Sequence, residues 1–171
     1  MSNLARKLLY LLVAMLLFPA ASASVPQGLT LVGKAELSIL WWDIYDAELY
    51  SQTGSYVPQQ KPLLLKISYK RAISRDDLLE ETLAQWQRFN IAAEKKQEWL
   101  TQLAQFWPDV KASDNISFYI DASGSCHFYF NDTFIGRVDD ASFSHYFANI
   151  WLDENGPYPD MTSALLGKTE Y

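Results

Sequence analysis

The stretch GLTLVGKAELSILWWDIYDAELY, residues 28–50, determines how the fold begins. Leu37, Ile39 and Trp41 alternate with their chain neighbours, and this period of two is typical of a β-strand with one buried face. The extended pattern continues to residue 50, although two aspartates interrupt it. We therefore predict that these residues form a bent hairpin of two strands.

Helices follow the next strand in one block. LLLKISYKR, residues 63–71, has the apolar alternation of a strand. Ser74 begins a capping-box pattern, and apolar residues at helical spacing predict a helix that includes Trp86. A second helix is expected to open at Asn90 and to end before the next Trp-Pro pair.

The second half of the chain returns to strands and closes with a helix. Short strands are predicted within residues 115–122, 126–131 and 132–138, and a helix over residues 140–152. Because the helices are grouped rather than alternating with single strands, the order indicates an α+β fold with an antiparallel sheet.

The N-terminus has the pattern of a secretory signal. Two basic residues precede the apolar run LLYLLVAMLLF (residues 8–18), which is shorter than the roughly 20 residues of a membrane-spanning helix. Ala21 and Ala23 place small side chains where a signal peptidase needs them. We predict cleavage after Ala23, a periplasmic location without stable membrane insertion, and a single domain at residues 24–171. An uncleaved N-terminal anchor is the alternative.

Charge and cysteine content restrict the partners and cofactors. The net charge of −6 argues against nucleic acid and anionic membrane surfaces, since both require a basic face. The single cysteine, Cys126, cannot form an internal disulfide. It neighbours His127, but adjacent residues of a strand point to opposite faces, so a nucleophilic pair is not expected. No ligand spacing connects these residues with His145, and we predict neither a metal nor a cofactor.

No motif for nucleotide binding or serine hydrolysis occurs. Acidic pairs such as Asp76-Asp77 and Asp139-Asp140 lie at predicted helix starts, where carboxylates complement the helix dipole. A glycosidase-like carboxylate pair is the alternative interpretation.

Aromatic and basic side chains gather at the predicted strand ends and could line an apolar pocket with one anionic anchor point. Alternatively, the tyrosines are core-edge residues, and Arg71 pairs with Asp76 or Asp77. The members of this cluster are Trp41, Trp42, Tyr45, Tyr50, Tyr69, Lys70, Arg71 and Trp86.

Four segments together resemble the chalcone isomerase-like family, and specifically its exported bacterial branch. They are residues 28–50, 63–82 and 115–152 and the closing LLG at 165–167. The most specific features are the spacing of Gly33 from the Tyr-Asp-Ala that follows and the Ile-Trp-Leu…Leu-Leu-Gly ending. The resemblance implies an open-faced β-sandwich, in which helices cover one face of a large antiparallel sheet and leave a cleft between the two layers.

Plant chalcone isomerases cyclise their substrate without a cofactor, by adding a phenolate to an enone. They use an arginine, two threonines, a tyrosine and an asparagine, and none of these is retained at the matching positions. The reaction needs a cation and hydroxyls to stabilise developing negative charge, so the resemblance implies the fold without the inherited chemistry. The matching positions hold Gln27, Leu40, Ser74, Glu81 and Met161.

We therefore expect a non-catalytic protein that binds a small apolar or amphipathic, fatty-acid-like ligand in the cleft. An anionic head group would have to be held by Lys34 or Arg71. One alternative is an isomerase or intramolecular lyase for another substrate, built on Tyr69 and Arg71. The other is an envelope partner or scaffold protein that uses its acidic surface. The candidate ligand-binding residues are Lys34, Tyr45, Tyr69, Arg71, Trp86 and Met161.

Overall fold

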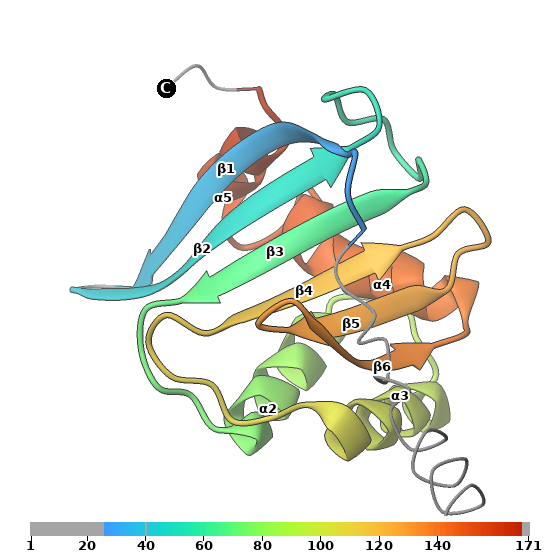
Figure 1. Ribbon diagram of the computed structural model, residues 1–171. Coiled ribbons are helices and arrows are strands. Elements are labelled where there is room, and N and C mark those ends of the chain that lie inside the picture. Colours follow the sequence, from blue (N-terminus) through green and yellow to red (C-terminus); the bar gives the residue numbers. More distant parts are fainter. Residues whose placement is uncertain (1–25, 40, 169–171) are drawn as a thin grey trace, which may run out of the picture.

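A six-stranded antiparallel sheet forms one layer of the protein (Figure 1). The computed structural model describes residues 26–39 and 41–168, so the predicted signal segment and Leu40 lie outside the described residues. Neighbouring strands in the sheet are also neighbours along the chain, as the predicted hairpins require. The strands are β1 (Thr30–Ile39), β2 (Trp42–Ser51), β3 (Leu63–Tyr69), β4 (Asn115–Ile120), β5 (Cys126–Phe130) and β6 (Thr133–Val138).

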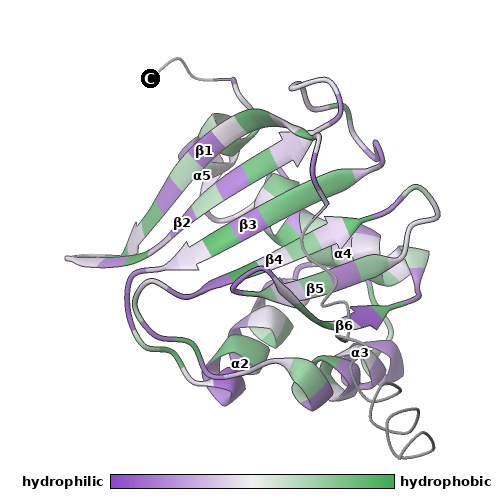
Figure 2. Ribbon diagram, viewed as in Figure 1, coloured by the Kyte–Doolittle hydropathy of each residue, from purple (hydrophilic) through white to green (hydrophobic). Residues whose placement is uncertain are grey.

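The strands alternate between a buried and an accessible face. In β1, Ala35 and Leu37 are buried whereas Lys34 and Glu36 are exposed, and Figure 2 shows the matching alternation of hydropathy along β1 to β3. The accessible face is bridged by ion pairs, among them Lys34 with Glu48 of the neighbouring strand. One apolar and one polar face explain why the helices of the described residues pack on one side of the sheet.

In residues 26–39 and 41–168, four helices cover the apolar face. Figure 1 shows α4 (Ala141–Leu152) and α5 (Pro159–Leu165) behind the strands, with α2 (Arg75–Trp86) and α3 (Ala93–Phe106) at the lower edge. The prediction of an α+β, open-faced sandwich with helices on one face of an antiparallel sheet is confirmed.

The helix starts follow local capping chemistry where a cap exists. The backbone N–H of Asp77 donates to the Ser74 hydroxyl at 3.1 Å, and the Asp140 carboxylate accepts from the first turn of α4. The prediction that Asn90 opens the second helix is wrong, because α3 begins at Ala93 after Ala92, which makes no side-chain cap. Asp77 and Asp140 therefore lie at the starts of α2 and α4, where the sequence predicted that carboxylates would stabilise the helices.

Aromatic rings fill the space between the layers. Phe143 and Phe147 of α4 stack at 5.1 Å, and Trp86 contacts both rings as well as Trp99 edge-on. Trp86 is completely buried. The prediction of Trp86 as a ligand-binding residue is therefore not supported, because the hydrophobic effect places this side chain in the core.

Two glycines from the two ends of the chain hold α5 against the sheet. A β-carbon on Gly33 of β1 would lie 2.3 Å from the carbonyl oxygen of Ala164 and 2.9 Å from the backbone nitrogen of Gly167. Gly167 has a φ of +70°, which favours glycine, and a β-carbon there would lie 2.7 Å from the carbonyl oxygen of Val32. Gly33 and the Leu-Leu-Gly ending, two features that marked the family resemblance, therefore contact each other through their backbones.

Candidate functional site

A cavity of about 330 Å³ opens between the sheet and the helices, beside β1 to β3. Its volume lies at the lower end of the range for small-molecule sites. Strands β1 to β3 supply one wall, and helices α2, α4 and α5 with their connections supply the other. The lining residues are Leu37, Ile39, Ile44, Tyr45, Ile67, Tyr69, Ile73, Asp77, Leu78, Glu81, Thr82, Gln85, Trp107, Ile150, Trp151, Tyr158 and Met161.

Two tyrosines stand side by side on the sheet wall. Tyr45 of β2 and Tyr69 of β3 are direct cross-strand partners, and their rings meet edge-on with centroids 6.4 Å apart. Antiparallel pairing brings opposite side chains together on one face, so the register of β2 on β3 creates this pair.

Helices α4 and α5 fix the Tyr45 side chain from the other wall. The indole N–H of Trp151 donates to the Tyr45 hydroxyl at 3.0 Å, and that hydroxyl lies 3.9 Å from the sulfur of Met161. Burial raises the pKa of Tyr45 well above its usual range, although the Trp151 hydrogen bond partly opposes this shift. Tyr45, like any phenol neutral at pH 7, therefore stays neutral in more alkaline solution as well.

Tyr69 differs from Tyr45 because its hydroxyl is not used. Within the described parts of the chain, no hydrogen bond engages this hydroxyl, although the residue is only 9% exposed. Burial also raises the pKa of Tyr69. The polar lining atom that is fully buried without a partner is the indole nitrogen of Trp107, and such a group costs free energy. The Tyr69 hydroxyl and the Trp107 N–H are both available to a polar atom of a bound molecule.

The accessible end of the cavity is acidic. Asp77 and Glu81 of α2 and Tyr158 are exposed lining residues, and Gln85 donates to the Glu81 carboxylate at 2.8 Å. Among the described residues that line the cavity there is no lysine, arginine or histidine. Chemically, the arrangement offers an apolar interior, a phenol inside it and negative charge at its opening.

Three of the six predicted ligand-binding residues meet in this cavity: Tyr45, Tyr69 and Met161. Lys34 does not, because it lies on the accessible face of β1 with Glu48. Arg71 does not either, because β3 ends at Tyr69 and the Arg71 guanidinium lies over the Trp42 ring, 5.2 Å from its centroid. The alternative pairing of Arg71 with Asp76 or Asp77 is also not observed.

The remaining members of the aromatic and basic cluster lie outside the cavity. Trp41 and Trp42 are 91% and 61% exposed at the β1–β2 turn, so they do not frame a pocket. Lys70 pairs with Glu36 and Asp46 on the accessible face of the sheet. Tyr50 donates to Glu48 on that same face.

Of the positions that match the chalcone isomerase residues, two line the cavity: Glu81 at its opening and Met161 inside it. Ser74 caps α2, and Gln27 lies in a separate hollow beside Tyr50. Leu40 is outside the described residues. The structure therefore provides no cation at the matching positions it describes.

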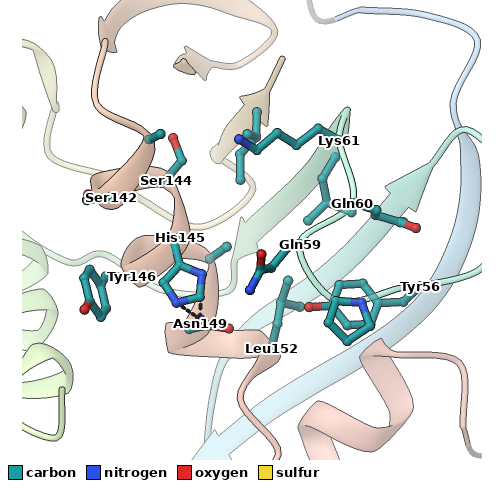
Figure 3. A pocket seen from close by; sticks show the side chains of 15 residues that line it. Tyr56, Gln59, Gln60, Lys61, Ser142, Ser144, His145, Tyr146, Asn149 and Leu152 are labelled. Atoms are coloured by element: carbon teal, nitrogen blue, oxygen red, sulfur yellow. Dashed lines mark hydrogen bonds between the residues drawn. The ribbon is translucent and has the colours of Figure 1, made fainter. Parts of the chain in front are cut away.

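A second hollow of about 490 Å³ lies between the β2–β3 loop and α4 (Figure 3). Figure 3 shows the His145 ring beside Asn149, with which it shares a hydrogen bond of 3.2 Å, and Lys61 to the right of Ser144. Lys61 and His145 are exposed. Its buried polar side chain, Ser144, already donates to the Gly124 carbonyl at 2.6 Å, so among its described lining residues this hollow offers no unpaired buried group of the kind found at the first cavity.

The histidines and the cysteine do not form a metal site. Cys126 is fully buried, and His127 points to the other face, where it contacts the Asp121 carboxylate at 2.9 Å. Burial raises the pKa of the Cys126 thiol well above its usual value. Among the residues that the structure describes, no group of three potential metal ligands occurs and no helix is long and apolar enough to cross a membrane.

The sequence did not predict most of the cavity-lining residues that lie on the helices and their connections. Trp107, Trp151 and Tyr158 follow no strand alternation, and nothing local shows that they meet the β2–β3 tyrosines. The position of Glu81 on α2, one helical turn after Asp77, could have indicated a shared acidic face.

Comparison with known proteins agrees with this architecture. The chain is 29% identical over 139 residues to an uncharacterized protein of Haemophilus influenzae, a match that covers 81% of this chain and 68% of that protein. A crystal structure of an Arabidopsis thaliana fatty-acid binding protein superimposes with a TM-score of 0.63 at 13% identity, over 88% of this chain and 91% of the other. That likeness establishes the fold. The chalcone isomerase-like family model matches residues 13–167, and the chain therefore belongs to the chalcone isomerase-like family.

Proposed function

We propose that this protein binds a small apolar or amphipathic ligand in the cavity between β1–β3 and the helices, without transforming it. The observation that carries the proposal is that two lining groups make no hydrogen bond among the described residues: the Tyr69 hydroxyl and the buried indole N–H of Trp107. The Arabidopsis thaliana relative in fold is a fatty-acid binding protein, and its existence supports a ligand-binding use of this architecture.

An isomerase or lyase is less well supported. Such an enzyme built on Tyr69 and Arg71 would need the guanidinium near the reacting atoms, but Arg71 lies over Trp42 outside the cavity. Removing one preorganised electrostatic donor typically reduces a rate by about 10²–10³-fold. A scaffold function would be favoured by a filled interior, whereas this protein keeps an open cavity.

The proposal is tested by extracting the purified protein with organic solvent and identifying co-purified amphiphiles by mass spectrometry. Intrinsic fluorescence then follows the rebinding of the same compounds, because Trp107 and Trp151 belong to the cavity wall. Leu78→Trp introduces bulk at the cavity and should abolish binding, whereas Val57→Trp, at an exposed loop position, should leave it unchanged. Saturable binding that Leu78→Trp does not reduce would contradict the proposed site.

We further propose that the domain acts after export to the periplasm. The support is the sequence of residues 1–23, which has the basic, apolar and small-residue regions of a signal. Cell fractionation and N-terminal sequencing test this proposal, and the expected mature N-terminus is Ser24.

A further inference from the structure

The opening of the cavity carries a charge opposite to the one that a fatty-acid site requires. A carboxylate ligand is normally held by lysine or arginine. Here the charged side chains of the lining are Asp77 and Glu81, both exposed at the opening.

The basic residues closest in sequence are occupied elsewhere. Lys70 bonds to Asp46 and Glu36 at 2.9 and 3.1 Å, and Arg75 pairs with Asp76. Arg71 lies over Trp42. Each of these cations has a partner outside the cavity, and none belongs to its lining.

The negative charge also acts inside the cavity. Glu81 is one of the groups whose charge contributes to the raised pKa of Tyr45, although burial is the main cause. An anionic head group would meet the same repulsion, whereas a cationic one would be attracted to Glu81 and to the aromatic faces of the wall. Tyr69 can meanwhile accept or donate a hydrogen bond deeper inside.

We infer that the ligand of this cavity is a cationic amphiphile, in which an ammonium group lies at the Asp77–Glu81 opening and the apolar body lies between the sheet and the helices. This inference rests on the proposed function and specifies the chemical class of its ligand. It differs from the fatty-acid-like ligand that the family resemblance implies.

Three probes with the same apolar chain test the inference: dodecylammonium, dodecanol and dodecanoate, each below its micelle concentration at neutral pH. Their affinities are compared by isothermal titration calorimetry. We expect dodecylammonium to bind at least about tenfold more tightly than dodecanoate, with dodecanol between them. A tenfold difference in affinity is what we expect when the charge of one head group interacts with the carboxylates at the edge of a partly desolvated cavity.

Glu81→Gln removes the proposed charge and should reduce the ammonium-to-carboxylate preference about threefold or more. Glu80→Gln removes the same charge from the preceding position of α2, which is outside the lining, and controls for attraction to the acidic protein as a whole. Glu81→Lys should make dodecanoate the preferred probe. Unchanged thermal unfolding of each variant shows that the fold is retained.

The outcomes separate the inference from the function it depends on. If none of the three probes binds, the proposed function itself fails. If dodecanoate or dodecanol binds as tightly as dodecylammonium, ligand binding stands and the cationic class is refuted. If Glu80→Gln reduces the ammonium-to-carboxylate preference as much as Glu81→Gln does, the preference comes from the overall acidity of the protein. That result would refute a specific contribution of Asp77 and Glu81 at the cavity opening.

Discussion

Gly33→Ala tests whether α5 is fixed by its close approach to β1. The added β-carbon would lie 2.3 Å from the carbonyl oxygen of Ala164 and 2.6 Å from that of Leu165. Both atoms belong to the backbone, so no side-chain rotation can relieve the contact. Helix α5 would have to retreat by about 0.7 Å or more to restore a tolerable separation of 3.0 Å.

Two effects of opposite sign decide the magnitude. Gly33 does not have a left-handed φ, and alanine in a strand is normally about 0.5–1 kcal/mol more stable than glycine. Overpacking typically costs about 1–3 kcal/mol and more where the surroundings are rigid. Because the neighbours are backbone atoms, we expect the overpacking to prevail and the free energy of unfolding to fall by about 2 kcal/mol.

The measurement is urea and thermal unfolding followed by circular dichroism. For a domain of this size, about 2 kcal/mol corresponds to a decrease in Tm of roughly 4–8 °C. Lys34→Ala is the control on the next residue of β1, where loss of the exposed pair with Glu48 should cost at most about 1 kcal/mol. Ligand affinity should fall with Gly33→Ala as well, because α5 carries Met161. A Gly33→Ala protein as stable as the parent, or more stable, would refute the reasoning.

Three further predictions concern packing, pH and reactivity. Arg88 donates to the Asp153 carboxylate at 2.6 Å and to backbone carbonyls at the end of α4, so Arg88→Gln should lower the free energy of unfolding in urea by about 1–2 kcal/mol; a loss below about 0.3 kcal/mol would contradict this. Burial opposes ionisation of Asp121, but hydrogen bonds from Ser123, from His127 and from the backbone of the turn prevail and lower its pKa. This contribution to stability is present above the unfolded pKa of about 3.9 and is lost as the pH falls through the lower folded value. Asp121→Asn should therefore be less stable than the parent at pH 7, and the difference in Tm should shrink below about pH 4. A difference in Tm that does not change with pH would contradict stabilisation by the ionised Asp121 carboxylate. Cys126, buried and with a raised pKa, should react with a thiol reagent only in denaturant, and stoichiometric labelling of the native protein would contradict its burial.

Features that depend on near neighbours could be predicted from the sequence. The hairpin of β1 and β2 follows from side-chain alternation, and the α2 cap follows from Ser74 and Asp77, three residues apart. The same alternation, continued backwards from Leu37, also places Lys34 on the accessible face. Lys34 could therefore have been excluded as a ligand-binding residue without a structure.

Other assignments failed because they required the end of a strand or a long-range contact. Arg71 lies two residues after Tyr69 and would point to the same face if the strand continued. Strand β3 ends at Tyr69, however, so strand alternation no longer determines where the Arg71 side chain points. Trp86 has the helical spacing of a lining residue, yet the rings of α3 and α4 enclose it in the core. Neither outcome is encoded within one turn or one strand.

The sequence by itself determined the α+β class, the order of the strands and helices, and the polarity of each face, because side-chain period and capping act over a few residues. Only the tertiary structure decided that Tyr45 and Tyr69 share a cavity with Met161, and that its opening is acidic. These residues come from β2, β3 and α5, and their meeting depends on strand register and on the glycine contact that holds α5 to β1. A site formed by such distant segments exists only once the layers have packed.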